Sequence, residues 1–265
     1  MNLLSYTESW DRAAPDYQRV YRLGLNEYNS ELLRFWEESG MLFPGARVID
    51  IGCGVGKYGT WLAELGYDVT LTDISGEMLR HAKENMSGYS TPWAVYQCDF
   101  NEVTGQEPVF AGGFDLAVST MSPAIHNAET VKKMSAMTRG WCFLARFSQW
   151  EQPFRDQLMR RMGMEPRPLH TGLKEDGDAM IRAVREAGFT PQVRHVDYNW
   201  SDRRTPEQMA DYLYRRYFSE DADAEEKGVA ALSAARDLAD ADGFVRDGVN
   251  AKAVWIWWNS RNKCL

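Results

Sequence analysis

The stretch Val48-Ile49-Asp50-Ile51-Gly52-Cys53-Gly54-Val55-Gly56-Lys57-Tyr58-Gly59 decides the fold. It starts as a short apolar run, passes through clustered glycines, and continues into a helical pattern over residues 57–65 that Gly66 ends. A strand that runs through glycines into a helix brings backbone N–H groups and a helix N-terminus to a ligand, because no side chains block the approach. The stretch therefore predicts a ligand-binding loop at the carboxyl end of a buried strand.

Two glycine spacings overlap in this loop. Gly54, Gly56 and Gly59 match the G-x-G-x-x-G spacing of dinucleotide enzymes. Asp50, Gly52, Gly54 and Gly56 match a D-x-G-x-G spacing. An acid beside the glycines would repel a pyrophosphate and attract an ammonium group, which favours the second spacing. A tight turn without a ligand also fits the glycines, and Asp50 could simply tie the loop together through backbone N–H bonds.

Strands and helices alternate along the rest of the chain. Apolar runs predict strands at 47–51, 68–73, 93–98, 114–119 and 140–145, and periodic patterns predict helices at 57–65, 75–85 and 128–137. Single helices between strands require right-handed crossovers, which build a mostly parallel sheet with helices on both faces. The sequence therefore predicts a doubly wound α/β fold.

Both flanks of this core carry additional helical patterns. Residues 8–39 read mostly as helix, and a helix at 176–187 and a strand at 192–198 follow the core. The last strand is expected at 251–258, so about 201–250 is an insertion longer than a hairpin needs. Thr205-Pro206-Glu207-Gln208 predicts a capped helix through about Tyr217, and the acidic stretch 221–240 predicts a second helix.

The order of motifs resembles that of class I S-adenosylmethionine-dependent methyltransferases over about residues 8–147. The D-x-G-x-G loop is similar to their first motif, and Leu71-Thr72-Asp73-Ile74-Ser75 is similar to the strand end that carries their ribose-binding acid. Asp99-Phe100 resembles their adenine-binding pair, and Trp10-Asp11 through Tyr17 resembles an N-terminal segment that folds over the cofactor. The resemblance implies S-adenosyl-L-methionine as the cofactor and a seven-stranded sheet with an antiparallel strand near the C-terminus.

The resemblance also implies roles for individual residues. The loop glycines would hold the methionine part of the cofactor, Asp50 its ammonium group, Asp73 the ribose and Asp99 the adenine amino group. The implied cofactor-binding residues are Trp10, Tyr17, Asp50, Gly52, Cys53, Gly54, Gly56, Asp73, Ile74, Asp99 and Phe100. We expect one methyltransferase domain over 1–265, with an N-terminal helical cap at 1–44, a cofactor-binding core at 45–147 and a C-terminal half at 148–265 that contains the insertion.

The segment after the fourth strand bears on the methyl acceptor. Amino-methyltransferases that act on nucleic-acid bases or glutamine carry Asn/Asp-Pro-Pro-aromatic there, and this chain has Ser122-Pro123-Ala124-Ile125 instead. The departure argues against those substrates and favours a small-molecule acceptor. His126 follows directly, at the sheet edge where such folds bind ligands, and is the best-placed candidate base. A helix-start histidine bonded to backbone is the alternative interpretation.

Composition limits the classes of partner. A net charge of −8 opposes binding to nucleic-acid backbones. The four cysteines are scattered without C-x-x-C spacing, which favours reduced thiols, a cytoplasmic location and no metal. We expect no membrane span or signal peptide, since no apolar run is long enough. Trp10, Trp150 and Trp200 are predicted around the mouth of an aromatic-lined pocket.

Two other functions are compatible with the residues. An NAD(P)-dependent oxidoreductase would share the glycines and Asp73, but it would give Asp99-Phe100 no role. A non-catalytic S-adenosylmethionine-binding protein would keep the loop without turnover. The acceptor, the atom that is methylated and the oligomeric state stay open at this point.

Overall fold

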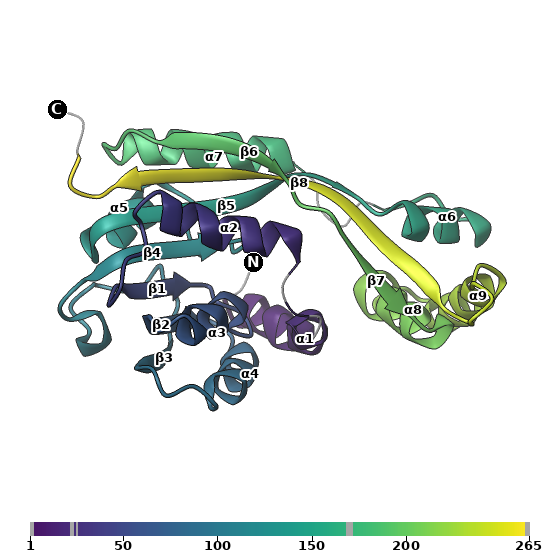
Figure 1. Ribbon diagram of the computed structural model, residues 1–265. Helices are drawn as coiled ribbons and strands as arrows, with labels where there is room; N and C mark the ends of the chain where they lie inside the picture. The colour runs from purple at the N-terminus through teal and green to yellow at the C-terminus, as the bar shows by residue number, and fades with distance from the viewer. Residues whose placement is uncertain (1–2, 22–23, 25, 168–171, 263–265) are drawn as a thin grey trace. The chain divides into compact units, whose positions relative to one another are not determined.

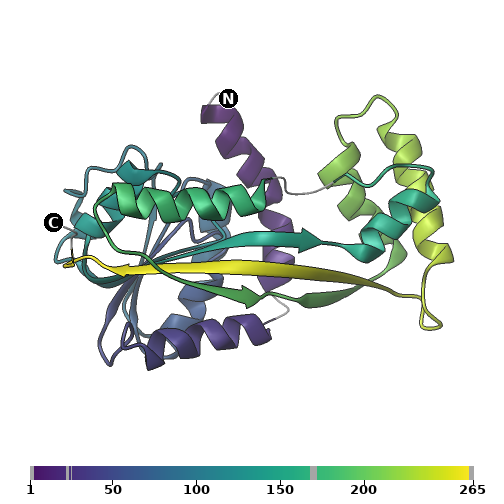
Figure 2. The same cartoon turned by 90° about the horizontal axis from the view of Figure 1, so that it is seen from above.

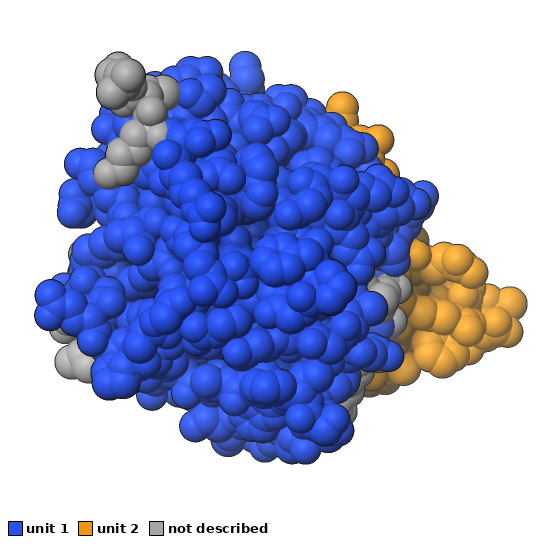
Figure 3. Space-filling model, turned by 60° about the vertical axis from the view of Figure 1, so that its left-hand side comes forward, with its two compact units in different colours: residues 1–147, 174–196, 253–265 blue, residues 148–173, 197–252 orange. Residues whose placement is uncertain are grey.

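The computed structural model describes residues 3–21, 24, 26–167 and 172–262. The chain divides into two compact units, which are described separately (Figure 3). Unit 1 comprises residues 1–147, 174–196 and 253–265, and unit 2 comprises residues 148–173 and 197–252. No helix within the described ranges is both long and apolar enough to cross a membrane.

Unit 1 is built on the predicted sheet (Figure 1). The strands are β1 (Arg47–Ile51), β2 (Asp68–Asp73), β3 (Trp93–Gln97), β4 (Phe114–Thr120), β5 (Thr138–Glu151), β6 (Gln192–Asp197) and β8 (Val245–Asn259). They lie in the order β3-β2-β1-β4-β5-β8-β6. The pairs β1–β2, β1–β4, β2–β3 and β4–β5 are parallel, and the β8 arrow runs opposite to β4 and β5. The predicted fold class is therefore confirmed.

Helices cover both faces of this sheet (Figure 2). On one face lie α2 (Glu27–Glu38), whose Phe35 stacks against Trp255 at 5.1 Å between ring centroids, and α3 (Lys57–Glu64). On the other lie α5 (Ala128–Ala136) and α7 (Leu173–Glu186), whose Met134 and Ala183 join a core cluster with Ile49 of β1. The helix α4 (Gly76–Met86) and the short helix η1 (Pro108–Phe110) complete the connections between strands. Burial of these apolar side chains stabilises the arrangement, and it leaves the strand ends for function.

The N-terminal segment differs from its prediction as one helical stretch over 8–39. It forms two helices, α1 (Leu3–Tyr21) and α2. Gly24 has a left-handed φ of 77°, which a helix cannot continue through, and the Asn26 side chain caps α2 by accepting the Asn29 N–H. The apolar periodicity of the two helices concealed this break.

Unit 2 contains the predicted helices and several elements that the sequence did not reveal. The predicted capping box is present at Thr205 and Gln208 and starts α8 (Pro206–Leu213), which continues as a π-helical turn, η2 (Tyr214–Phe218). The acidic stretch forms α9 (Ala224–Asp237). Helix α6 (Pro153–Arg161), strand β7 (Trp200–Arg204) and the first part of β8 were not predicted. β7 pairs antiparallel with residues 245–249 of β8.

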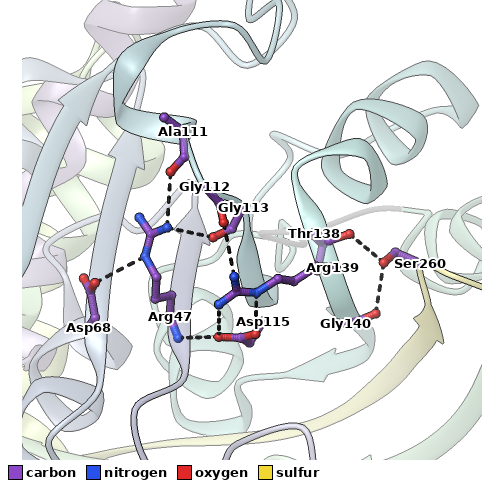
Figure 4. A network of polar contacts seen from close by, with 10 residues as sticks. All are labelled: Arg47, Asp68, Ala111, Gly112, Gly113, Asp115, Thr138, Arg139, Gly140 and Ser260. Carbon is purple, nitrogen blue, oxygen red and sulfur yellow. Dashed lines mark hydrogen bonds and ion pairs between the residues drawn. The ribbon is translucent and has the colours of Figure 1, made fainter.

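The amino ends of β1, β4 and β5 are tied together around Asp115 (Figure 4). Its carboxylate accepts Nε and Nη2 of Arg139 at 2.7 and 3.0 Å, and the backbone N–H of Arg47 at 3.0 Å. Arg47 in turn donates Nε to Asp68 of β2 at 3.3 Å. These charge-assisted bonds fix the strand ends opposite the glycine loop and lower the pKa of Asp115.

Candidate cofactor site

The glycine loop lies between β1 and α3 and is bonded to β2. The backbone N–H groups of Gly52 and Cys53 donate to the Thr72 carbonyl at 2.8 and 2.9 Å. Gly52, Gly54 and Gly56 have φ values of 73°, 55° and 79°. Side chains other than hydrogen are strained in this left-handed region, so the loop path requires glycine. Gly56 caps α3 without a side-chain hydrogen bond, which leaves the helix N-terminus for a ligand.

Position 52 also requires glycine because there is no room for a side chain. A Cβ built there would lie 1.8 Å from Ser122 Oγ and 2.7 Å from Ser122 Cβ. The buried Ser122 follows β4, so the segment after β4 packs directly on the glycine loop. This contact could not be predicted from the sequence, because nothing in the local pattern around Ser122 identifies its neighbour.

Asp50 is buried at the end of β1 with neither carboxylate oxygen satisfied. Only 1% of the residue is exposed, and within the described part of the chain Oδ1 and Oδ2 accept no hydrogen bond. Burial, and next the negative charge of Asp73, raise the pKa of Asp50 to about 7. The hydrogen bonds that a loop-tying role for Asp50 requires are therefore absent from the described residues. A buried carboxylate of this kind is suited to a cationic ligand.

Asp73, at the end of β2, fastens the loop from the other side. Its Oδ2 accepts the Gly54 N–H at 2.9 Å, and its Oδ1 accepts the Ser75 N–H at 2.9 Å. Burial raises the pKa of Asp73, while these two backbone bonds partly offset that effect. Each carboxylate oxygen retains a further lone pair, so Asp73 can also accept hydroxyl donors. The neighbouring Ile74 is half-buried, and its carbonyl accepts Gln97 Nε2 at 3.0 Å.

Helix α1 lies against the loop and α4. The Asp11 Oδ1 atom accepts Ser75 Oγ at 2.5 Å and the Glu77 N–H at 3.2 Å, which caps α4. Trp10 packs on an apolar cluster that includes Val55 of the loop, and its ring meets Tyr17 edge-on at 6.2 Å. The structure thus brings the predicted residues Trp10 and Tyr17 to the loop.

Two further contacts of α1 escaped the sequence analysis. Gln18 and Asn85 exchange hydrogen bonds of 2.9 Å, and Asn85 also donates to the Val55 carbonyl at 2.9 Å. The two amides are far apart in sequence. Gln18 is buried on the side of α1 that also carries Asp11, and no local sequence pattern identifies Asn85 as its partner.

Asp99 and Phe100 follow β3 and have different environments. Asp99 is half-buried, and its Oδ1 accepts the backbone N–H and the side-chain amide of Asn101, both at 2.9 Å. Phe100 is 4% exposed and belongs to the core cluster shared with α5 and α7. Asp99 is therefore partly accessible after β3, whereas Phe100 packs in the core. Cys53 of the loop is buried, and burial raises the pKa of its thiol, which stays neutral.

The segment after β4 carries His126 and an unusual backbone conformation. Met121 has a φ of 53°, the one positive value outside glycine in the described ranges. The His126 backbone N–H donates to Thr130 Oγ1 at 3.1 Å, and its side chain is exposed. The main chain of His126 is thus bonded to the start of α5, as expected for a histidine at a helix start. The imidazole stays accessible.

The remaining predicted residues lie elsewhere. Trp150 and Trp200 pack against each other in unit 2 at 4.9 Å, whereas Trp10 belongs to unit 1. The aromatic pocket mouth stays a prediction. Cys264 lies outside the described residues. Within the described ranges no group of three or more His, Cys, Asp or Glu side chains could hold a metal ion.

Comparison with known proteins identifies the family. Residues 48–140 match the family model of a methyltransferase domain. The chain therefore carries a domain of the S-adenosylmethionine-dependent methyltransferases over these residues. Methyltransferase domains of this family use S-adenosylmethionine, which favours this cofactor over a dinucleotide at the glycine loop.

Relatives of the methyltransferase match it over different lengths. YqeM of Bacillus subtilis (strain 168) is 40% identical over 83 residues, and the match covers 31% of the methyltransferase and 31% of YqeM. The ubiquinone biosynthesis O-methyltransferase of Thiobacillus denitrificans is 28% identical over 190 residues, or 66% of the methyltransferase and 78% of that protein. The crystal structure of the [4+2]-cyclase SpnF superposes with a TM-score of 0.54 at 14% identity, over 96% and 95% of the two chains, which supports the fold.

Proposed function

We propose that this chain transfers a methyl group from S-adenosylmethionine to a small-molecule acceptor. The observation that carries the proposal is the buried carboxylate of Asp50, which has no hydrogen-bond partner among the described residues and stands beside the glycine loop. Similarity to a ubiquinone biosynthesis O-methyltransferase over most of that protein supports a small acceptor. The net charge of −8 supports it further, because it opposes binding to nucleic acid. Among the described residues Cys53, Cys98 and Cys142 form no disulfide, which supports a cytoplasmic enzyme.

The residues at the loop fit the cofactor chemically. The Asp50 carboxylate would accept the ammonium group, and the bare backbone at Gly52 and Gly54 would admit the methionine part. Asp73, which already holds the loop, would accept the ribose hydroxyls with its remaining lone pairs. Asp99 would accept the adenine amino group at the edge of the site. Cys53, Gly56 and Ile74 would line it, with Phe100 behind them.

The cofactor supplies an electrophilic methyl group on a sulfonium sulfur, which an acceptor displaces in line. Much of the work left to the protein is alignment and exclusion of water. Trp10 and Tyr17 on α1 would cover the cofactor, and an aromatic face near the sulfonium would stabilise its charge. His126, whose imidazole is exposed beside the strand ends, would accept a proton from a hydroxyl or ammonium acceptor.

The substrate class is tested with tritium-labelled S-adenosylmethionine. The whole chain is incubated separately with phenols, amines, thiols and carboxylates of low molecular mass, with total RNA, and with a protein mixture. We expect label in one of the small-molecule classes. Label found only in RNA or protein would refute the small-molecule acceptor while leaving the methyltransferase activity intact.

The role of His126 is tested by His126→Gln with His195→Gln as the matched control, since His195 is an exposed histidine on β6. If His126 is the base, the variant loses about 100-fold or more in kcat with a hydroxyl acceptor. Its affinity for S-adenosylhomocysteine stays at the wild-type value. Equal activity of the two variants would mean that His126 serves only the start of α5.

A further inference from the structure

Arg146 of β5 is a buried cation at the carboxyl end of the sheet. It is 5% exposed, and its guanidinium donates Nη1 to the carbonyls of Ala145 at 2.9 Å and Ser119 at 3.4 Å, and Nη2 to the carbonyl of Ile125. The nearest carboxylate that pairs with it is Asp176 of α7, which is half exposed and 3.8 Å from Nε. Burial lowers the pKa of Arg146 to about 10, so it remains charged at neutral pH. Backbone carbonyls are therefore its main partners.

Those carbonyls bracket one short segment, residues 120–125, which we call the β4 turn. Ser119 precedes the turn and Ile125 ends it, so one guanidinium holds both sides. Inside the turn, the Met121 N–H donates to Ala145 O at 2.9 Å, the same carbonyl that Arg146 contacts. Met121 takes its φ of 53° at this point. Such a conformation persists only where surrounding contacts enforce it. The contacts here are the Met121 bond to Ala145 and the Arg146 bonds on both sides of the turn.

The β4 turn is one of the segments of unit 1 that pack on the glycine loop. Ser122 is buried, its Oγ accepts the Ala124 N–H at 3.3 Å, and it fills the space in which a side chain at Gly52 would lie. A shift of the turn by about 1 Å would open or close this contact, because the two segments already touch. The turn thus packs on Gly52, and Arg146 bonds both sides of the turn.

We propose that Arg146 is a positioning residue for the cofactor site: its guanidinium holds the β4 turn so that Ser122 stays packed against Gly52. Arg146 acts through Ser122 and makes no contact with the cofactor itself. The inference rests on the proposed function, since the loop at Gly52 is taken as the cofactor loop. A lysine could not replace the planar fork that reaches three carbonyls at once.

The test is a double-mutant cycle read by isothermal titration with S-adenosylhomocysteine. The variants are Arg146→Lys, Ser122→Ala and the two combined, with Arg139→Lys at the opposite end of β5 as the control. We expect Kd to rise about tenfold for Arg146→Lys and about threefold for Ser122→Ala. The double variant should stay near tenfold instead of reaching the product of about thirty. Arg139→Lys should leave Kd unchanged.

The outcomes separate the inference from the function on which it rests. Failure of the wild-type chain to bind S-adenosylhomocysteine would overturn the proposed function. Wild-type binding with strictly additive effects of Arg146→Lys and Ser122→Ala would overturn the positioning role alone. Hydrogen exchange gives a readout independent of binding: amides of residues 119–127 should exchange at least about tenfold faster in Arg146→Lys, with β1 unchanged. Unchanged exchange in 119–127 would also contradict the role.

A second pair of variants covers the case in which Arg146→Lys fails to fold. Gly52→Ala should abolish measurable binding of S-adenosylhomocysteine, because the new Cβ would lie 1.8 Å from Ser122 Oγ. Adding Ser122→Gly removes that clash, although the φ of 73° still strains the alanine. We expect the pair to regain at least about a fifth of the wild-type affinity. No recovery would contradict the idea that Ser122 sets the space at Gly52.

Discussion

Asp73 accepts the backbone N–H of Gly54 at 2.9 Å, so the acid at the end of β2 holds the glycine loop at the end of β1. The same carboxylate accepts the Ser75 N–H at 2.9 Å, which fixes the start of α4. Two strand ends and one helix start thus meet at a single side chain. The loop proposed to bind the cofactor is thus already held in place by Asp73, which would lower the ordering cost of binding.

Removing the Asp73 carboxylate should therefore weaken cofactor binding more than it weakens the fold. Asp73→Ala leaves the N–H groups of Gly54 and Ser75 without their acceptor, and it removes the proposed ribose ligand. We expect a loss of about 100-fold in affinity for S-adenosylhomocysteine by isothermal titration. Asp68→Asn, at the other end of β2, is the control and should bind normally. Equal affinity in both variants would show that Asp73 is not a binding residue.

The raised pKa of Asp50 predicts a pH dependence of binding. An ammonium group is attracted to the ionised carboxylate, and Asp50 loses its proton as pH rises through about 7. Affinity for S-adenosylhomocysteine should fall by up to about tenfold per unit below pH 7 and level off above it. Asp50→Asn should bind more weakly at pH 8 and show a flatter profile. A variant with the wild-type slope would assign the dependence to another group.

The same carboxyl group predicts how stability changes with pH in the absence of cofactor. Its folded pKa of about 7 lies above the ordinary value of 3.8, so the folded state holds the proton more tightly. The free energy of unfolding should therefore fall as pH rises from about 4 to about 7, by no more than about 4 kcal/mol. Asp50→Asn should lose this slope and be more stable than the wild type at pH 8. Urea denaturation at a series of pH values measures both.

The Asp115 network predicts a stability effect without a binding effect. Asp115→Ala leaves the Arg47 N–H and the Arg139 guanidinium without their shared acceptor at the amino ends of the strands. We expect the free energy of unfolding to drop by about 1–3 kcal/mol, as measured by urea denaturation. The Kd for S-adenosylhomocysteine should not change, because the network ties the strand ends opposite the loop. A large change in Kd would mean that the two ends of the sheet are coupled.

The bonds of Asp11 predict how firmly α1 is held against the start of α4. Asp11→Ala removes the acceptor for Ser75 Oγ and the Glu77 N–H, so α1 loses its polar bonds to the start of α4. Hydrogen exchange over residues 6–20 should become faster by about fivefold, and cofactor affinity should fall about threefold. Glu8→Ala on an exposed position of the same helix is the control. Identical exchange in the two variants would exclude a role for Asp11 in docking α1.

Much of unit 1 could be predicted because its signals are local. The strand, glycine and helix pattern from Val48 to Gly59 needs no distant partner to be recognised, and Asp73 sits where a strand end meets an N-cap serine. The contacts of these residues were not predictable in the same way. That Asp50 has no hydrogen-bond partner among the described residues, or that Ser122 fills the space at Gly52, depends on residues far away in the sequence.

Unit 2 shows where local signals mislead. Asp247-Gly248 is a typical turn pair, yet β8 runs straight through it from Val245 to Asn259. Pairing with β7 overrides the turn preference, with Asp202 directly opposite Asp247 in the ladder. Arg204 lies between these two acids, 3.2 and 3.1 Å from their carboxylates, and offsets their repulsion. From the sequence alone, the charged residues of this stretch are typical of a loop. Their pairing across β7 and β8 is seen only in the structure.

Isothermal titration of the whole chain with S-adenosylhomocysteine, with NAD as the comparison, tests the central claim most directly. We predict saturable binding of S-adenosylhomocysteine with one site per chain, abolished in Gly54→Val and weakened in Asp50→Asn, and no binding of NAD. Tight NAD binding with no heat from S-adenosylhomocysteine would contradict the assignment of the glycine loop.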